Sequence, residues 1–179
     1  DSKKLLLGMN SLLPDDIRIL QCQSCDALFN SNKDSKSKEY HYYFSTDTIS
    51  NPILNDIVEY IPFSDIELMK EACKLFIGEH DFYSFAKRDA TMDSTFRTIL
   101  SCEILEAQAL TLGNKIYYLK IVGEGFLRYM VRYMAGALFS LGRKKLSLGD
   151  ISEALSIHKE EKISARAKSH GLHLIEISY

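Results

Sequence analysis

Hydrophobic side chains recur every three or four residues in segment 63–81, which is the period of an amphipathic helix. Ser64 and Glu67 form the pattern of a capping box near its start, and Gly78 is a residue type that ends helices. The apolar stripe comprises Ile66, Met69, Cys73, Phe76 and Ile77. The pattern predicts a helix here, and a second capping-box pattern at 147–150 predicts the start of another.

Other stretches alternate apolar and polar residues or are rich in aromatic and β-branched ones, which is typical of strands. Gly113 and Asn114 separate two of these stretches and predict a hairpin turn, and the lysine-rich stretch 30–39 predicts an exposed loop. Helices mixed with hairpins, and few βαβ units, predict an α+β domain: a mostly antiparallel sheet with helices packed on one face. The predicted strands cover 16–23, 40–44, 96–107, 116–123 and 171–179.

An apolar segment over about 125–141 is predicted to be a helix, yet it contains Arg128 and Arg132. Four residues apart, these two arginines would stack on one helix face. Removing one partner of a buried ion pair costs about 3–5 kcal/mol, so a buried guanidinium implies an anion beside it. That anion is either a carboxylate of the protein or a phosphate of a ligand. The alternative is a surface helix whose arginines reach out to water.

The composition is that of a globular protein, with 46% hydrophobic and 26% charged residues in 179. This length suits one domain, or one domain and a piece of another. A net charge of −2 gives no overall positive field, so any anion site must be a local group of lysines and arginines. No apolar run approaches the roughly 20 residues that cross a bilayer.

Two groups of residues are candidates for contact with a polyanion. The aromatic residues Tyr40, Tyr42 and Tyr43 follow the lysine-rich loop and suit stacking on bases, although packing in a strand is the alternative. Short basic clusters could line a cleft together with the two arginines, although each cluster alone is typical of a solvated surface. These clusters are Lys87–Arg88 and Arg143–Lys144–Lys145.

Cys22 and Cys25 form a Cys-x-x-Cys pair, which is half of a zinc site. His170 and His173 could complete it, and free thiols in a reducing cytoplasm are the alternative. The sequence contains no Gly-rich phosphate loop, no Gly-x-Ser-x-Gly elbow and no His-Glu-x-x-His motif. These absences give no support to the enzyme classes that depend on such motifs.

Several stretches, taken together and in order, resemble the TruA-type tRNA pseudouridine synthases. The most specific is "FLRYMVR" within "GFLRYMVRYMAGAL" at 125–138. The resemblance covers nearly the whole chain. The other stretches are "LGMNSLLPDDIRIL" (7–20), "KEYHYYF" (38–44), "GEHDFYSF" (78–85), "FRTI" (96–99) and "SHGLHLIEISY" (169–179).

The resemblance implies an enzyme that isomerises uridine to pseudouridine in the anticodon stem-loop of tRNA, at tRNA positions 38–40, without metal or organic cofactor. An aspartate attacks the nucleoside after the base has left its stack. Arg132 matches the arginine that pairs with that aspartate, and Tyr40 matches the tyrosine that lies against the uracil. Phe126, Arg128 and Val131 are expected beside the substrate, with phosphates contacted by Lys87, Arg88, Arg143, Lys144 and Lys145. The resemblance further implies tRNA as partner, a homodimer and a cytoplasmic protein with no membrane association.

The chain departs from the family pattern in lacking the Gly-Arg-Thr-Asp motif that carries the aspartate. Asp47 and Asp89 do not occupy the matching position. We therefore expect the chain to be the C-terminal half of such an enzyme and to be inactive by itself. Residues 1–30 would be a remnant of the N-terminal domain, and 31–179 would form the catalytic and RNA-binding domain. A non-catalytic RNA-binding module of the same fold is the alternative. At two positions, Leu28 and Ala86, the chain lacks an arginine that is usual in the family. The resemblance therefore does not determine the path of the RNA across the protein.

Overall fold

The computed structural model describes residues 1–31, 33–87, 94–108, 113–158 and 161–179. It divides the chain into two compact units, 1–34 and 35–179. The smaller unit contains one helix, α1 (Ser2–Leu12), whose first turn is capped by the Asp1 carboxylate accepting from the Lys3 backbone N–H. The rest of this unit contains neither helix nor strand among its described residues.

The predicted strand over 16–23 is wrong. The Ile19 backbone N–H and carbonyl both bond to the Asn10 side chain, at 2.8 Å each, so an amide group takes the place of a neighbouring strand. An alternating pattern becomes a strand only where a partner strand accepts its backbone groups.

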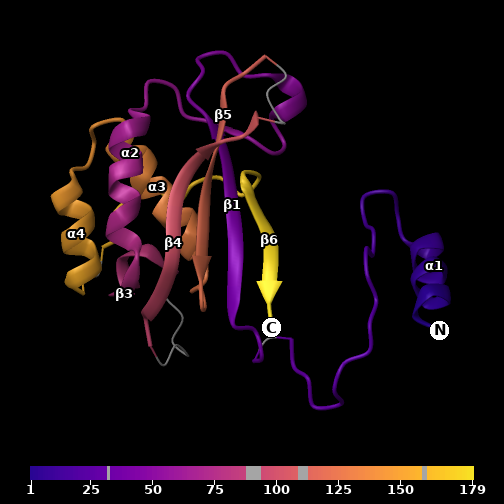
Figure 1. Ribbon diagram of the computed structural model, residues 1–179. Coiled ribbons are helices and arrows are strands. Elements are labelled where there is room, and N and C mark those ends of the chain that lie inside the picture. Colours follow the sequence, from indigo (N-terminus) through magenta and orange to yellow (C-terminus); the bar gives the residue numbers. More distant parts are fainter. Residues whose placement is uncertain (32, 88–93, 109–112, 159–160) are drawn as a thin grey trace. The chain divides into compact units, whose positions relative to one another are not determined.

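The larger unit is built on a six-stranded sheet with the order β2-β1-β5-β4-β3, and β6 also pairs with β1 (Figure 1). Every pairing is antiparallel except that of β1 with β2. The predicted hairpin is confirmed, because the strands on either side of the Gly113 turn pair along their length. The strands are β1 (Ser37–Ser45), β2 (Glu59–Tyr60), β3 (Gly78–Asp81), β4 (Phe96–Glu106), β5 (Ile116–Gly123) and β6 (Leu172–Ser178).

Three α-helices cover one face of this sheet, as Figure 1 shows, and the main core lies between the two layers. They are α2 (Ile66–Cys73), α3 (Met130–Gly142) and α4 (Leu148–Ser156), with short 3₁₀ turns η1 (Pro52–Leu54), η2 (Lys74–Phe76) and η3 (Tyr83–Phe85). The predicted α+β class is confirmed. Within the described ranges, no helix is long and apolar enough to cross a membrane.

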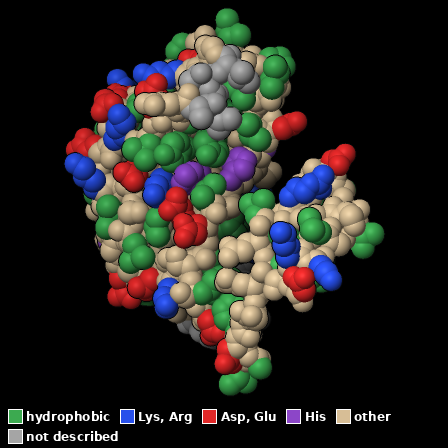
Figure 2. Space-filling view, turned by 45° about the vertical axis from the view of Figure 1, so that its right-hand side comes forward, with side chains coloured by type: hydrophobic (Ala, Val, Ile, Leu, Met, Phe, Trp, Pro, Cys, Tyr) green, Lys and Arg blue, Asp and Glu red, His purple; other side chains and the backbone are tan. Residues whose placement is uncertain are grey.

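Alternate residues of β1 show how the sheet separates core from surface. Tyr42 and Phe44 are fully buried under the helices, whereas His41 points to the other face, where it lies opposite His173 of β6. Figure 2 shows a side of the larger unit on which histidine side chains lie among hydrophobic ones. The period of two along β1 places Tyr40 on the same face as Tyr42, toward the helices.

The boundaries of α2 differ from the prediction. Asp65, and not Ser64, caps the helix, because its carboxylate accepts from the Leu68 N–H while the Ser64 hydroxyl donates to a backbone carbonyl upstream. The helix tightens into η2 after Cys73, and Gly78, with φ +108°, begins β3. The second predicted capping box, at 147–150, is confirmed at the start of α4.

The arginine-bearing helix begins later than predicted. α3 starts at Met130, because Tyr129 adopts a left-handed conformation with φ 64° and the preceding residues form a loop. The Lys87 N–H donates to the Arg128 carbonyl at 2.9 Å, which holds this loop in place. Arg128 therefore lies outside the helix, and the predicted stacking of Arg128 and Arg132 on one helix face is wrong.

Asp81, in the family-like "GEHDFYSF" stretch, joins three segments of the larger unit. Its carboxylate accepts from the Thr95 hydroxyl and the Tyr83 N–H, and it lies 3.1 Å from Nδ1 of His158. Burial raises the pKa of this carboxyl, but the hydrogen bonds outweigh burial and lower the pKa below its usual value.

This lowered pKa predicts a pH dependence of stability. The contribution of Asp81 is fully present above the unfolded-state pKa of about 4 and is lost as the pH falls through the folded-state value. We expect Asp81→Asn to lower the free energy of unfolding at neutral pH and to lose less stability than the wild type on acidification. Urea unfolding at neutral pH and at about pH 3 measures both effects. Equal acid sensitivity of variant and wild type would contradict this role.

Candidate functional site

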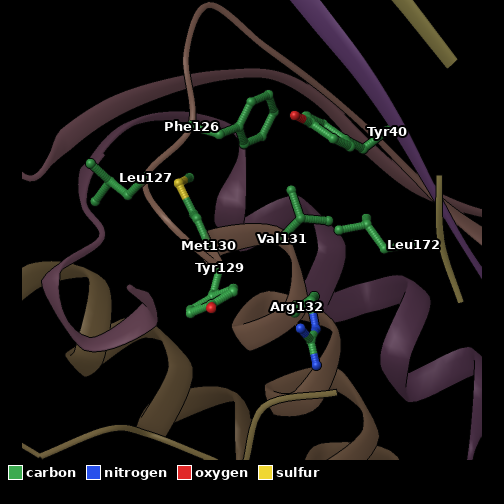
Figure 3. A pocket seen from close by; sticks show the side chains of 8 residues that line it. All are labelled: Tyr40, Phe126, Leu127, Tyr129, Met130, Val131, Arg132 and Leu172. Carbon is green, nitrogen blue, oxygen red and sulfur yellow. The ribbon is translucent and has the colours of Figure 1, made fainter. Parts of the chain in front are cut away.

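A pocket of about 100 Å³ opens where the start of α3, the loop before it, β1 and β6 meet (Figure 3). Figure 3 shows the rings of Tyr40 and Phe126 on one side of the pocket and the Arg132 guanidinium and Tyr129 ring on the other. The lining residues are Tyr40, Phe126, Leu127, Tyr129, Met130, Val131, Arg132 and Leu172. Four residues predicted for the site, Tyr40, Phe126, Val131 and Arg132, are thus brought together.

The first side of the pocket is aromatic and apolar. Tyr40 and Phe126 meet edge to face, with ring centroids 5.0 Å apart and planes at 81°. Val131 is buried at the start of α3 behind them. Burial raises the pKa of the Tyr40 phenol, so this side is uncharged at neutral pH. A surface of this kind suits the flat face of a nucleobase.

The second side carries a half-buried cation. The Nε–H of Arg132 donates to the Ala167 carbonyl at 2.7 Å, and the Ala167 N–H donates back to the Arg132 carbonyl at 3.0 Å. The Nε–H bond holds the side chain along the pocket, and the backbone bond holds the Ala167 segment against α3. No carboxylate among the described residues forms an ion pair with Arg132. A partly desolvated guanidinium in this position favours binding of an anion.

Tyr129 is surrounded by three guanidinium groups. Their carbon atoms lie 4.0 Å (Arg166), 5.1 Å (Arg128) and 5.6 Å (Arg132) from the ring centroid. The pKa of the Tyr129 phenol is lowered, because an Arg128 N–H donates to its oxygen at 3.4 Å and the guanidinium charges favour the phenolate. Positive charge is therefore concentrated on this side of the pocket.

The segment before β6 is held against both the sheet and α3. The Tyr42 hydroxyl bonds to the Glu59 carboxylate and lies 2.7 Å from the Lys168 carbonyl, and the Lys168 N–H donates to the same carboxylate at 3.1 Å. Further along, the Tyr43 N–H donates to the Gly171 carbonyl at 2.8 Å. A Cβ at Gly171 would lie 2.7 Å from the Tyr42 ring, so this close approach requires glycine.

The predicted phosphate contacts do not all lie at this pocket. Lys87 is exposed and is joined by its backbone to Arg128, beside the pocket. Arg88 lies outside the described residues. The exposed cluster Arg143–Lys144–Lys145 follows the C-terminal end of α3, whose 13 residues span about 20 Å, whereas the pocket lies at the N-terminal end. The structure thus separates this cluster from the pocket.

Asp47, an alternative nucleophile, is not among the residues that line the pocket. Within the described part of the chain, no group of three or more His, Cys, Asp and Glu side chains could hold a metal ion. Asp47 accepts from the Asn114 side chain and the Lys115 N–H, at the end of the sheet away from the pocket. Asp89 lies outside the described residues.

Sequence reasoning missed part of the site. Leu172 lies in the "HGLHL" stretch and faces the pocket from β6, and Arg166 stacks on Tyr129 from a segment more than 30 residues away. One signal was available for Arg166: basic residues alternate with small ones in "RAKSH", at Arg166, Lys168 and His170. Such alternation puts the basic side chains on one side of an extended segment.

Comparison with known proteins bears on what this pocket does. The family model described as tRNA pseudouridine synthase matches residues 72–179. The tRNA pseudouridine synthase A 2 of Desulfotalea psychrophila is 47% identical over 178 residues, which are 97% of this chain and 67% of that protein. The tRNA pseudouridine synthases A of Pseudothermotoga lettingae and Bacillus pumilus are 33% and 36% identical, over 100% and 96% of this chain and 71% and 68% of their own lengths.

Proposed function

We infer the function of this chain from the family to which it belongs, that of the tRNA pseudouridine synthases. We propose that the protein isomerises uridine to pseudouridine in the anticodon stem-loop of tRNA, and that the pocket of Tyr40, Phe126 and Arg132 receives the uridine. The alternative, a non-catalytic RNA-binding module, would use the same surface without turnover.

The proposed reaction exchanges one bond of the nucleoside for another. The bond from the ribose C1′ to N1 of uracil breaks, the ring turns, and C1′ bonds to C5. The hydrogen on C5 leaves as a proton and N1 gains one, so the product is an isomer of the substrate. An aspartate that attacks the nucleoside must be ionised to act as a nucleophile. A base must also leave its stack to reach the pocket.

The observation that carries the proposal is the pairing of an aromatic side with a half-buried guanidinium that no described carboxylate neutralises. Tyr40 supports the uracil by ring contact, with Phe126 and Val131 behind it. Arg132 pairs with the nucleophilic aspartate and keeps its pKa low, since an opposite charge within about 4–6 Å lowers a carboxyl pKa by 1–3 units. Arg128, beside the pocket, contacts the RNA backbone.

Loss of the C5 hydrogen provides the test. Two proteins are incubated with a tRNA transcript whose uracils carry tritium at C5, and tritium released to water is measured. One is the chain alone, which lacks the Gly-Arg-Thr-Asp motif and is expected to release none. The other, called the joined protein, is the chain joined to a segment that carries this motif. From the joined protein we expect release at the anticodon stem-loop uridines, with none from a transcript in which those uridines are replaced by cytidines. Salt-dependent tRNA binding without tritium release would favour the RNA-binding module instead.

We also propose a homodimer in the cytoplasm, which the family resemblance supports. Sedimentation of the protein with and without tRNA tests the assembly, and a monomer at all concentrations would overturn it.

A further inference from the structure

We propose that Tyr129 and Arg166 form, with Arg128, a binding site for one phosphodiester group of the RNA at the mouth of the pocket. The proposal rests on the proposed function, because it assumes that the ligand of the pocket is an RNA nucleotide. It assigns a role to Arg166, which lies outside the stretches that carry the family resemblance.

The geometry of the group starts with the backbone of Tyr129. Its left-handed conformation, φ 64°, interrupts the chain before α3 and leaves the ring at the edge of the pocket. Arg166 lies with its guanidinium carbon 4.0 Å from the ring centroid, which is a stacking distance, and Arg128 contacts both ring and hydroxyl. One aromatic ring thus positions two guanidinium groups from segments far apart in sequence.

The position of Arg166 is fixed by the segment that carries it. The next residue, Ala167, is buried and exchanges two hydrogen bonds with Arg132, and Lys168 is bonded to Glu59. The backbone under Arg166 is therefore docked, while its side chain is exposed to solvent. A docked backbone with a stacked, exposed guanidinium is a preorganised cation, which loses little freedom when it binds.

The electrostatics of the group call for an anion. Like charges held close together repel, and no described carboxylate forms an ion pair with Arg128 or Arg166. The aspartate expected beside Arg132 would neutralise only one of the three guanidinium groups. The two that remain, Arg128 and Arg166, match the fork geometry with which arginine binds a phosphate.

The salt dependence of tRNA binding tests the proposal, with the joined protein of the tritium assay and an unmodified tRNA transcript. We expect Arg166→Gln to weaken binding about tenfold at low salt, as loss of one charge-assisted hydrogen bond does. The slope of log affinity against log salt should fall by about one, because one fewer phosphate is neutralised. Arg166→Lys, which keeps the charge, should keep the wild-type slope.

Lys115→Gln is the matched control, because this exposed lysine precedes β5 at the end of the sheet opposite the pocket. It removes the same charge and should keep both affinity and slope near those of the wild type. If Arg166→Gln keeps the wild-type slope while the wild type binds tRNA and releases tritium, the phosphate site is wrong and the proposed function stands. If the wild type shows neither binding nor release, the proposed function itself fails.

Discussion

Replacing Arg132 with glutamine is expected to lower the rate of pseudouridine formation by about 10²- to 10⁴-fold, the equivalent of breaking a buried ion pair. Arg132 is half-buried at the pocket, its Nε–H is held by Ala167, and no described carboxylate pairs with it. The substitution removes the charge that would keep the nucleophilic aspartate ionised. The rate is measured in the joined protein, which carries the aspartate, by tritium release under single-turnover conditions, so that tRNA binding does not limit it.

Arg132→Lys is the conservative control. Lysine restores a positive charge but cannot reproduce the Nε–H bond to the Ala167 carbonyl together with a second, forked contact. We expect a rate between those of the wild type and Arg132→Gln. Near-wild-type rates for both variants would exclude Arg132 from the chemistry.

Replacing Gly136 with alanine is expected to destabilise the protein by about 1–3 kcal/mol or more, as overpacking does. A Cβ at Gly136 would lie 2.0 Å from the Ala165 carbonyl oxygen, far inside contact distance. The obstructing oxygen belongs to the backbone and cannot rotate away, so α3 and the segment carrying Arg166 must separate. This separation would also disturb the hydrogen bonds between Arg132 and Ala167, because Ala167 lies two residues after Ala165. The free energy of unfolding in urea measures the effect.

Gly149→Ala provides the matched control in α4. Its added Cβ would meet only the Ser147 hydroxyl oxygen, at 3.5 Å, which is ordinary contact. Because alanine is the better helix former, this variant is expected to be more stable than the wild type by up to about 1 kcal/mol. A Gly136→Ala protein as stable as the wild type would show that α3 does not dock closely on segment 164–167.

Local patterns predicted much of the larger unit. The strand over 116–123 has the predicted bounds, and the capping box at Ser147 starts α4. In both cases the determining interactions lie within a few residues: alternation of burial along a strand, and a reciprocal bond within one helical turn. The hairpin that joins β4 to β5 follows from the turn chemistry around Gly113 in the same way.

The failures have a common physical cause, which is competition from contacts that a local pattern does not contain. Segment 16–23 has a strand pattern, but the Asn10 side chain takes the backbone groups of Ile19. Residues 125–129 have a helix pattern, but the left-handed Tyr129 and the bond from Lys87 to Arg128 keep them in a loop. Tertiary contacts override propensity in both places.

The pocket was predictable only in part for the same reason. Four of its residues lie in stretches that resemble a known family, and the structure places all four at one pocket: Tyr40, Phe126, Val131 and Arg132. Arg166 is placed against the Tyr129 ring by the hydrogen bonds of Ala167 and by the close approach of Gly136, and no sequence motif contains either contact.

The most direct test of the central claim is the pH dependence of the single-turnover rate for wild type and Arg132→Gln. If Arg132 lowers the pKa of the nucleophilic carboxyl, the midpoint of the acid limb should move upward by about 1–3 pH units in the variant. The sign follows because the rate requires the ionised carboxylate, and loss of the cation raises its pKa. A variant that is slower at every pH with an unmoved acid limb would contradict the account.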